Sequence, residues 1–438
     1  MGNYDFVRTW DIGKIKELQF KLLKKQIQYV SETSQFYKRK FRKVGLTLSD
    51  IRTIKDIEKI PFTTKEDLTK YNDDFICVSN EEIVDYCSTT GTTGKPVMVP
   101  LTFKEWRQEI ELKKEFFLDV GLKKGDVVQN SMAFDQLFGI CIFLDAALKE
   151  LGIMSLRPGP GNSKRQIELM LRFNTTAIVA FPEYMLVLAK TAKEMGLDPA
   201  KDFGLDKGIL LAQNLYTKYW KPNALRKKIE EIWNIDIFSF YGSTELCGGF
   251  PECQSHGGYH IPSHKVFVEI IDPETQEVLE PGEEGELVFT HLVRESMPLL
   301  RYRQGDITYL QTSTCVCGKN TPRMMSIHGR TDQMIKLKGT PFYPDQIEEV
   351  VDAISGVSDY IIELFMDPRG YAQLKIIASI VGDQGRIIDQ IKNDIKNEIR
   401  LTPVIEIRPS EEIGARKYIN GTRKPKRFWD RRIKMIEE

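Results

Sequence analysis

Extended apolar runs alternate with helical stretches between about residues 97 and 245, and this alternation most limits the folds open to the chain. The apolar runs include AIVAF at 177–181 and DIFSFYG at 236–242. Between such runs lie stretches with helical character, among them KRQIELMLRF and EYMLVLAKTAKEMG. This order predicts an α/β fold in which helices cover both faces of a mostly parallel sheet.

The regions on either side of this α/β core differ from it. About the first 80 residues are predicted to be amphipathic helices, because IGKIKELQFKLLKKQIQYV spaces its apolar groups by three and four residues. After Gly257 short strands and turns follow one another, which predicts a β-rich subdomain. A last alternating unit predicts helices at 345–354 and 385–400 and strands at 360–365 and 374–380. We therefore predict an N-terminal domain of residues 1–331 and a small α+β C-terminal domain of residues 332–438.

Composition limits the partners and the location. At 438 residues, the chain exceeds the size of a single hydrophobic core, so two or more domains are expected. Its 62 basic and 62 acidic side chains balance, so net charge gives no reason to expect nucleic acid or a membrane as a partner. The start of the sequence lacks a signal peptide's apolar stretch, so we expect a cytoplasmic protein. Its 7 cysteines are then read as reduced thiols or metal ligands.

The stretch CSTTGTTGKP at 87–96 combines small hydroxyl residues, glycines and a lysine. Exposed backbone amides and hydroxyls can surround a phosphate group closely, and the lysine adds a positive charge. The spacing does not match a Walker A loop, since Gly91 and Gly94 are too close and Lys95 precedes Pro96. A Ser/Thr/Gly surface loop without a ligand is the alternative.

Four further motifs follow in order: FYGSTE at 240–245, RYRQGD at 301–306, GRTDQMIKLKG at 329–339 and RKPKR at 423–427. Together with the first stretch they resemble the ordered core motifs of the acyl-adenylate-forming superfamily. YCSTTGTTGKP, PECQSHGGYHI and GRTDQMIKLKGTPFYPDQIEEV are most similar to the phenylacetate-CoA ligase family. The resemblance extends from about Phe6 over nearly the whole chain.

The resemblance implies an ATP-dependent acid:CoA ligase whose cofactors are ATP, Mg²⁺ and CoA. A carboxylate attacks the α-phosphorus of ATP and releases pyrophosphate, and the CoA thiol then displaces AMP from the acyl-adenylate. Charge develops on phosphate and carbonyl oxygens, so electrostatic stabilisation and positioning would supply most of the catalysis. Two alternatives stay open: an adenylate-forming enzyme that passes the acyl group or AMP to another acceptor, and a non-catalytic nucleotide sensor.

The resemblance assigns roles in ATP binding to residues of the first two motifs. In YGSTE, Tyr241 would lie against adenine, Thr244 would contact the α-phosphate, and Glu245 would carry Mg²⁺, while Gly242 and Ser243 complete the loop. Tyr241 has the alternative role of a core aromatic at the end of a strand. The loop around the β- and γ-phosphates would comprise Ser88, Thr89, Thr90, Gly91, Thr92, Thr93, Gly94 and Lys95.

Further nucleotide contacts are implied along the chain. Asp306 would accept hydrogen bonds from both ribose hydroxyls, unless its Gly-Asp pair only forms a turn. Arg330 would reach the ribose or the phosphates, with a structural ion pair as the alternative. Adenine would be bordered by Ala212, Gln213 and Asn214, where the family often has an acidic residue and a proline.

The C-terminal motifs imply a moving domain. Lys424 would bridge the carboxylate and the α-phosphate during adenylation, with Lys426 as an alternate, because this role requires a point charge on a long stem. Asp332 would lie at the hinge, or would only cap a helix. The residues near the CoA tunnel would be Lys336, Lys338 and Gly339.

Cysteine and histidine gather between residues 247 and 328. Cys315 and Cys317 form a Cys-x-Cys turn, and ECQSHGGYH contributes Cys253 with His256 or His260. Three thiolates and one imidazole form a closed structural zinc set, for which we choose His260 because the ligase branch has Gly-x-His there. Separate reduced cysteines are the alternative.

The acyl pocket is implied by the segment 129–143. Met132, Phe134, Phe138 and Ile140 would offer a flat apolar wall suited to an aryl carboxylic acid, or would fill an ordinary core. Phenylacetate, another arylacetate, an indole acid and an aliphatic acid all stay open. A homodimer is common among the relatives, although nothing in the sequence establishes it.

Overall fold

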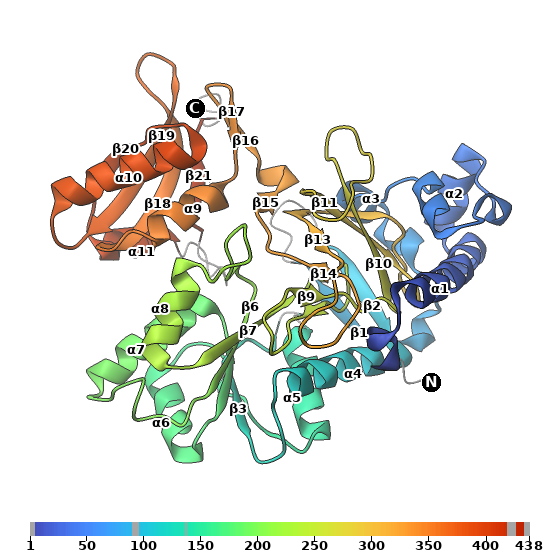
Figure 1. Ribbon diagram of the computed structural model, residues 1–438, viewed down its shortest axis with the longest axis horizontal. Helices are drawn as coiled ribbons and strands as arrows, with labels where there is room; N and C mark the ends of the chain where they lie inside the picture. The colour runs from blue at the N-terminus through green and yellow to red at the C-terminus, as the bar shows by residue number, and fades with distance from the viewer. Residues whose placement is uncertain (1–4, 90–95, 136, 138, 418–425, 433–438) are drawn as a thin grey trace. The chain divides into compact units, whose positions relative to one another are not determined.

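The computed structural model describes residues 5–89, 96–135, 137, 139–417 and 426–432 (Figure 1). The chain divides into two compact units, one formed by residues 1–215 and 226–326 and the other by residues 216–225 and 327–438. Each unit has a hydrophobic core of its own. The domain boundary that we predicted at residue 332 stays a prediction.

The larger unit is built on a six-stranded sheet in the order β4-β3-β5-β6-β7-β8. Strands β3 to β7 are parallel, and the edge strand β8 is antiparallel to β7. The mostly parallel sheet with helices between its strands is therefore confirmed. The strands are β3 (Val127–Asn130), β4 (Met154–Leu156), β5 (Ala177–Ala180), β6 (Lys207–Leu211), β7 (Asp236–Tyr241) and β8 (Phe250–Pro251).

Helices cover this sheet because alternate strand residues point to opposite faces. Val179, Ile209 and Phe238 pack in one core with apolar residues of α4 (Phe103–Asp119) and α5 (Ile140–Glu150). Ile178 and Leu210, one position along, are also fully buried. In Figure 1, α6 and α7 lie on the other side of the sheet from α5. The helices on that side are α6 (Ser163–Phe173), α7 (Pro182–Glu194) and α8 (Ala224–Trp233).

Antiparallel strands form the predicted β-rich subdomain. β10 (Val266–Ile271), β11 (Gly285–His291) and β12 (Tyr302–Thr308) pair in that order. A small sheet joins β13 (Leu310–Gln311), β14 (Arg323–Met324) and β9 (Tyr259–His260). This small sheet matters for the site because it brings His260 next to the segment that follows β13.

The N-terminal region is helical, as predicted. Its elements are α1 (Ile12–Thr33), α2 (Gln35–Val44) and α3 (Lys65–Tyr71), followed by the hairpin of β1 (Ile83–Ser88) and β2 (Met98–Thr102). Asp11 caps α1 by accepting a hydrogen bond from the Lys14 amide. Short 3₁₀ helices lie at Asp5–Thr9, Leu48–Asp50, Ile54–Lys59, Asn72–Phe75, Asn80–Glu82 and Thr331–Gln333.

The smaller unit contains a four-stranded sheet in the order β20-β19-β18-β21. One face packs against α9 (Pro344–Asp352) and α10 (Gln384–Ile399), and the other packs against α11 (Ser410–Lys417). The predicted helices and the strands β18 (Val357–Met366) and β19 (Ala372–Ile380) are present, whereas β20 (Val404–Ile407), α11 and β21 (Phe428–Asp430) were not predicted. The remaining strands are β15 (Gly329–Arg330), β16 (Ile335–Leu337) and β17 (Thr340–Phe342).

A tight hairpin joins β16 and β17 in this unit. Lys338 and Gly339 both have positive φ, 51° and 82°. Two successive positive φ angles define a type I′ turn, which glycine adopts without steric cost.

Among the described residues, no helix combines the length and the apolarity that crossing a membrane requires.

Candidate active site and metal centre

The predicted adenine and phosphate residues follow two neighbouring strands. β6 and β7 are parallel and adjacent, so their carboxyl ends meet at one edge of the sheet. Ala212, Gln213 and Asn214 come directly after β6, and the YGSTE segment begins at the last residue of β7. Ala212 has a left-handed backbone, with φ of 67°. The fold therefore places the two segments at the edge where α/β proteins commonly bind ligands.

Tyr241 and Asp306 are in direct contact. The Tyr241 hydroxyl donates a hydrogen bond of 2.6 Å to Oδ2 of Asp306, and the two residues are 7% and 6% exposed. Asp306 belongs to β12, so this bond links the parallel sheet to the antiparallel one. Tyr241 also packs against the Phe250 ring, with a centroid distance of 5.5 Å, so part of the tyrosine does serve the core.

The loop after Tyr241 is held from several sides. The Ser243 hydroxyl donates to Oε1 of Gln304 over 3.1 Å, and the Leu246 amide donates to Ser243 Oγ over 3.1 Å. Thr244 donates to the Ser88 carbonyl over 3.5 Å, which connects this loop to the first motif. Gly242 is required sterically, because a Cβ there would lie 2.8 Å from the Gly248 carbonyl oxygen. Gln304 lies inside the RYRQGD motif, yet we had not assigned it a role.

Glu245 is a buried carboxylate in the middle of this loop. It is 7% exposed, and within the described part of the chain its side chain has no hydrogen-bond or ion-pair partner. Burial of a charged group costs free energy unless a partner compensates it. The carboxylate is therefore available to a cation, and Mg²⁺ is commonly bound by one carboxylate together with substrate phosphates.

The base of the predicted phosphate loop is closed by backbone and side-chain hydrogen bonds. The Thr89 amide donates to the Val97 carbonyl over 3.1 Å, and the Val97 amide donates to Thr89 Oγ1 over 2.9 Å. Ser88 and Thr89 are the members of the predicted loop that the structure describes. Outside the described residues lie Thr90, Gly91, Thr92, Thr93, Gly94 and Lys95.

In the smaller unit, Arg330 and Asp332 pair with each other. Arg330 Nε lies 3.2 Å from Asp332 Oδ1, and Asp332 belongs to the 3₁₀ helix at Thr331–Gln333. This contact is the structural ion pair that we considered as the alternative role for Arg330. Lys336 is exposed on β16, Lys338 donates to Gln373 Oε1 over 2.7 Å, and Gly339 occupies the turn. The proposed roles of these residues stay predictions.

Of the two lysines considered for catalysis, Lys426 is among the described residues. Lys424 lies outside the described residues. Lys426 Nζ lies 4.1 Å from the centre of the Trp429 ring, a cation–π contact. The next residue, Arg427, donates to Asp352 Oδ2 over 3.1 Å, so the motif's arginine anchors β21 to α9. Lys426 is therefore already in contact with an aromatic ring, and the catalytic role that we give to Lys424 stays a prediction.

The predicted acyl wall lies against the core of the larger unit. Met132 is completely buried in the cluster that contains α4 and α5. Phe134 and Ile140 are partly buried against the same cluster. Phe138 lies outside the described residues. Met132 thus matches the ordinary-core alternative, whereas Phe134 and Ile140 keep exposed surface.

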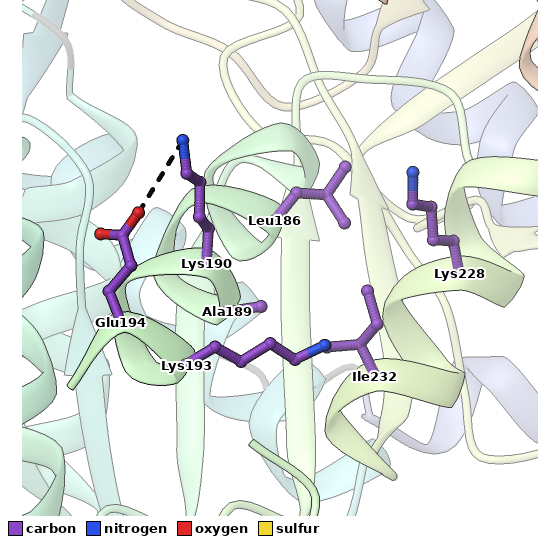
Figure 2. Close-up of a pocket in the computed structure, with 7 residues that line it drawn as sticks. All are labelled: Leu186, Ala189, Lys190, Lys193, Glu194, Lys228 and Ile232. Atoms are coloured by element: carbon purple, nitrogen blue, oxygen red, sulfur yellow. Dashed lines mark ion pairs between the residues drawn. The ribbon is translucent and has the colours of Figure 1, made fainter. Parts of the chain in front are cut away.

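A separate hollow of about 480 Å³ lies between α7 and α8, away from all these residues. Figure 2 shows the side chains that line it, apolar ones together with three lysines and a glutamate. Lys190 and Glu194 are 3.9 Å apart on the same helix. Its lining consists of Leu186, Ala189, Lys190, Lys193, Glu194, Lys228 and Ile232, so none of the predicted site residues belongs to it.

Four predicted metal ligands meet in one cluster. The ligand atoms of Cys253, His260, Cys315 and Cys317 all lie within 4.8 Å of one another. The Cys253 and Cys315 sulfurs are 3.9 Å apart, and His260 Nε2 lies 3.3 Å from Cys253 Sγ and 3.5 Å from Cys317 Sγ. Tetrahedral zinc bound through sulfur and nitrogen separates its ligand atoms by about 3.5–3.8 Å. The donor set and spacing fit such an ion.

The electrostatics of this cluster also suit a cation. Burial, together with nearby Lys319 and Arg323, lowers the pKa of His260 to about 3, so its imidazole is neutral and can coordinate. Burial raises the pKa of the Cys253 thiol to about 12, so its ionisation requires a positive charge nearby. His260 Nδ1 lies 3.3 Å from Thr321 Oγ1, a contact that fixes the ring while Nε2 faces the sulfurs.

His256, the other candidate ligand, is occupied elsewhere. Its Nδ1 lies 2.8 Å from Glu252 Oε1, and its Nε2 lies 3.0 Å from Asp236 Oδ1. Burial opposes its charge, but the hydrogen bonds that His256 donates to the Asp236 and Glu252 carboxylates prevail and raise the pKa of His256 to about 9. A protonated imidazole cannot bind a metal, so the geometry favours His260.

Comparison with known proteins shows the family of this chain. A model of the AMP-binding enzyme family matches residues 25–292, more than half of the chain. The phenylacetate-coenzyme A ligase of Thermus thermophilus is 33% identical over 348 residues, which cover 78% of this chain and 76% of that protein. The phenylacetate-coenzyme A ligase of Aromatoleum evansii is 30% identical over 99% of this chain and 98% of that protein. The chain belongs to the AMP-binding enzyme family and, within it, to the phenylacetate-coenzyme A ligase family.

Solved structures show the same fold. A crystal structure of 2-hydroxyisobutyryl-CoA ligase in the postadenylation state superposes with a TM-score of 0.85. The match covers 97% of this chain and 91% of that one, at 21% sequence identity. At this identity the likeness establishes the fold.

Proposed function

We propose that this protein is an ATP-dependent acid:CoA ligase that forms an acyl-adenylate with release of pyrophosphate and then transfers the acyl group to CoA with release of AMP. Membership of the phenylacetate-coenzyme A ligase family supports this reaction. The observation that carries the proposal is the convergence of Tyr241, Asp306 and the Glu245 loop at one edge of the sheet. These are the residues that the resemblance connects with adenine, ribose and Mg²⁺.

The chemistry of the first step follows from the residues at this edge. Asp306, an acceptor with two oxygens, would hold the ribose hydroxyls, and Tyr241 would keep that carboxylate oriented through its 2.6 Å hydrogen bond. Glu245 would hold Mg²⁺, which neutralises phosphate charge when bound. Thr244 would contact the α-phosphate, and Lys424 would bring the carboxylate and that phosphate together. Positioning and charge stabilisation would therefore carry catalysis, without a protein nucleophile.

An aryl carboxylic acid is the proposed acyl substrate. The relatives named above are phenylacetate-coenzyme A ligases, and Phe134 and Ile140 offer apolar surface beside the core. The test is a panel of phenylacetate, substituted arylacetates, indole acids and aliphatic acids, scored by CoA-dependent AMP formation. Preference for an aliphatic acid would contradict the aryl assignment and leave the ligase reaction intact.

The acceptor of the acyl group can be tested separately. Pyrophosphate release and AMP release are measured with and without CoA, using the preferred acid. A ligase requires CoA for multiple turnovers that release AMP. Turnover that is indifferent to CoA would instead support transfer to another acceptor.

A structural zinc ion is the second part of the proposal. Cys253, His260, Cys315 and Cys317 would hold it, because their spacing and protonation fit a tetrahedral site. Four protein ligands leave no position for a substrate, so the ion would stabilise the β-rich subdomain.

We also propose a cytoplasmic protein without nucleic-acid or membrane partners. Light scattering would test whether it forms a homodimer.

A further inference from the structure

His291 connects three segments next to the Glu245 loop. It is the last residue of β11 and is 3% exposed. Its Nε2 lies 3.0 Å from the Leu246 carbonyl oxygen, so Nε2–H donates to that carbonyl. Its Nδ1 accepts a hydrogen bond of 3.0 Å from the Leu299 amide. Both ring nitrogens are therefore engaged, which defines a single neutral tautomer.

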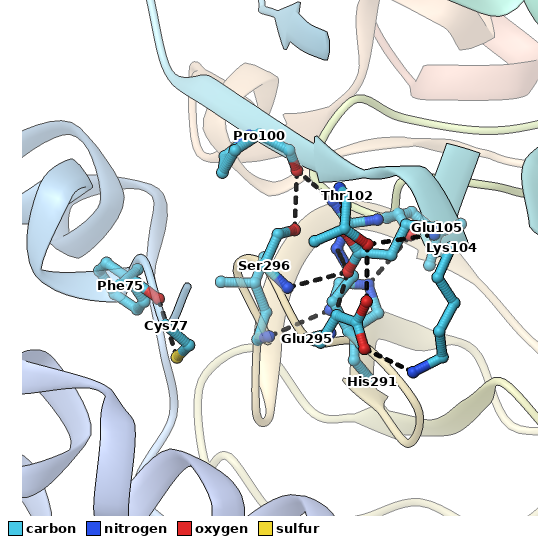
Figure 3. Close-up of polar contacts among 12 residues, drawn as sticks. Phe75, Cys77, Pro100, Thr102, Lys104, Glu105, His291, Glu295 and Ser296 are labelled. Atoms are coloured by element: carbon cyan, nitrogen blue, oxygen red, sulfur yellow. Dashed lines mark hydrogen bonds and ion pairs between the residues drawn. The ribbon is translucent and has the colours of Figure 1, made fainter. Parts of the chain in front are cut away.

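The surroundings keep this imidazole neutral. Burial lowers the pKa of His291 to about 3, and Arg294 opposes protonation further, whereas Glu105 favours it. Figure 3 shows His291 beside the polar cluster that includes Thr102, Glu105 and Glu295. Within this cluster Glu105 accepts hydrogen bonds from the Glu295 and Ser296 amides over 2.9 and 3.0 Å. His291 thus lies beside groups that are held in place by hydrogen bonds of their own.

Leu246 is the residue directly after Glu245, and both polar groups of its backbone are bound. Its amide donates to Ser243 Oγ over 3.1 Å, and its carbonyl accepts from His291. Ser243 is in turn bound to Gln304. The following backbone is unusual, since Cys247 and Gly248 have φ angles of 41° and 145°. Two strands, β11 through His291 and β12 through Gln304, therefore hold the backbone that directly follows Glu245.

We propose that His291 is a positioning residue for adenylation: its Nε2–H holds the Leu246 carbonyl and thereby fixes the Glu245 carboxylate where it binds the Mg²⁺ of Mg·ATP. This inference rests on the proposed function, because it assigns a role within that reaction. The inference predicts different effects of a His291 substitution on the rates of the two half-reactions. Adenylation depends on the position of the metal-binding carboxylate, whereas thioesterification of a finished acyl-adenylate does not.

Two isosteric substitutions test the two nitrogens separately. His291→Gln keeps an N–H near the Nε2 position, and His291→Asn keeps only an acceptor near Nδ1. We expect His291→Asn to slow pyrophosphate release by about tenfold to a hundredfold, because small displacements of a catalytic group have effects of this size. It should also raise the Mg²⁺ concentration for half-maximal rate, while the rate from supplied acyl-adenylate changes by less than about twofold. His291→Gln should restore most of the adenylation rate.

The controls separate positioning from stability. His264→Gln removes another buried histidine, and it should leave the Mg²⁺ dependence unchanged. Ser243→Ala removes the hydrogen bond that the Leu246 amide donates to Ser243 Oγ. It should therefore cause the same selective loss of adenylation. This variant tests the inference in case His291→Asn does not fold. Equal losses in both half-reactions, equal losses in the Gln and Asn variants, or an unchanged Mg²⁺ dependence would each overturn the inference.

The design also distinguishes this inference from the proposed function. If the wild-type protein releases no pyrophosphate with any acid, the proposed function fails. Mg²⁺-dependent ATP binding, measured by calorimetry without an acid, then gives the same comparison of variants. Weaker Mg²⁺-dependent binding in His291→Asn but not in His291→Gln supports the inference, and identical binding in all variants overturns it.

Discussion

The Tyr241 hydroxyl donates a hydrogen bond of 2.6 Å to Asp306 Oδ2, although the two residues are 65 positions apart and belong to different sheets. The bond joins the residue proposed to lie against adenine with the residue proposed to bind ribose. Its consequence is that the orientation of Asp306 depends on the tyrosine. The proposed role of each residue in ATP binding can therefore be tested by substituting the other.

Asp306→Asn should weaken ATP binding strongly. The variant keeps the shape of the side chain but removes the charge, and a hydrogen bond to a charged group contributes about 1.5–3 kcal/mol. The KM for ATP should therefore rise by roughly tenfold to a hundredfold. Tyr241→Phe retains the ring and should raise that KM by only about fivefold, as expected for about 1 kcal/mol. A double-mutant cycle in which the two effects simply add would contradict the proposed dependence.

Lys424→Ala should abolish adenylation selectively. Removing a charge that stabilises the transition state typically lowers a rate by about 10²–10³. Pyrophosphate release should fall by this factor, while thioester formation from supplied acyl-adenylate is spared. Lys426→Ala is the matched control, because the Lys426 ammonium lies over the Trp429 ring. The reverse pattern would assign the role to Lys426, and equal loss of both steps would refute the role given to Lys424.

Purified protein should contain one zinc ion per chain. Cys315→Ser removes one predicted ligand and should lower both the zinc content and the melting temperature. Cys77→Ser is a suitable control, because Cys77 is a half-buried thiol outside the cluster. Elemental analysis and thermal unfolding measure the two effects. Wild-type protein with clearly less than one zinc after gentle purification would argue against a structural ion.

Stability should fall in acid partly because of His264. Burial, with Lys265 and Arg8 nearby, lowers the pKa of His264 to about 3 in the folded protein, against 6.5 for an unperturbed histidine. Between these values the unfolded chain binds a proton that the folded chain does not, so stability decreases as pH falls below 6.5. From pH 7.5 to pH 5 the loss is about 2 kcal/mol. Urea unfolding of His264→Gln should show a smaller decrease over this range, and an equal decrease would contradict the assignment.

The secondary structure was predictable wherever a segment has its own pattern of apolar and polar residues. The parallel strands β5 and β7 are nearly continuous apolar runs between amphipathic helices, and both were predicted. β21 could not be, because Phe428–Asp430 is a short stretch in a basic tail that becomes a strand only by pairing with β18. Its structure comes from tertiary contact, which local sequence does not contain.

The site shows the same division. Spacing and residue type indicated the three cysteines of the metal cluster and two candidate histidines, since Cys-x-Cys is a local signal. The choice between His256 and His260 was made from a family resemblance, and only the structure shows the carboxylates that surround His256. His291 carried no signal at all, because a single histidine at the end of an apolar strand becomes significant only when Leu246 is placed beside it.

The outer strands of the six-stranded sheet bear on how copies of this protein can associate. β8 has two residues, one of them Pro251, which offers no backbone N–H, and β4 at the opposite edge has three. Short edges of this kind give an approaching chain few hydrogen-bonding positions. A dimer, if one forms, would join through side-chain surfaces and not by extending this sheet from one subunit into the next.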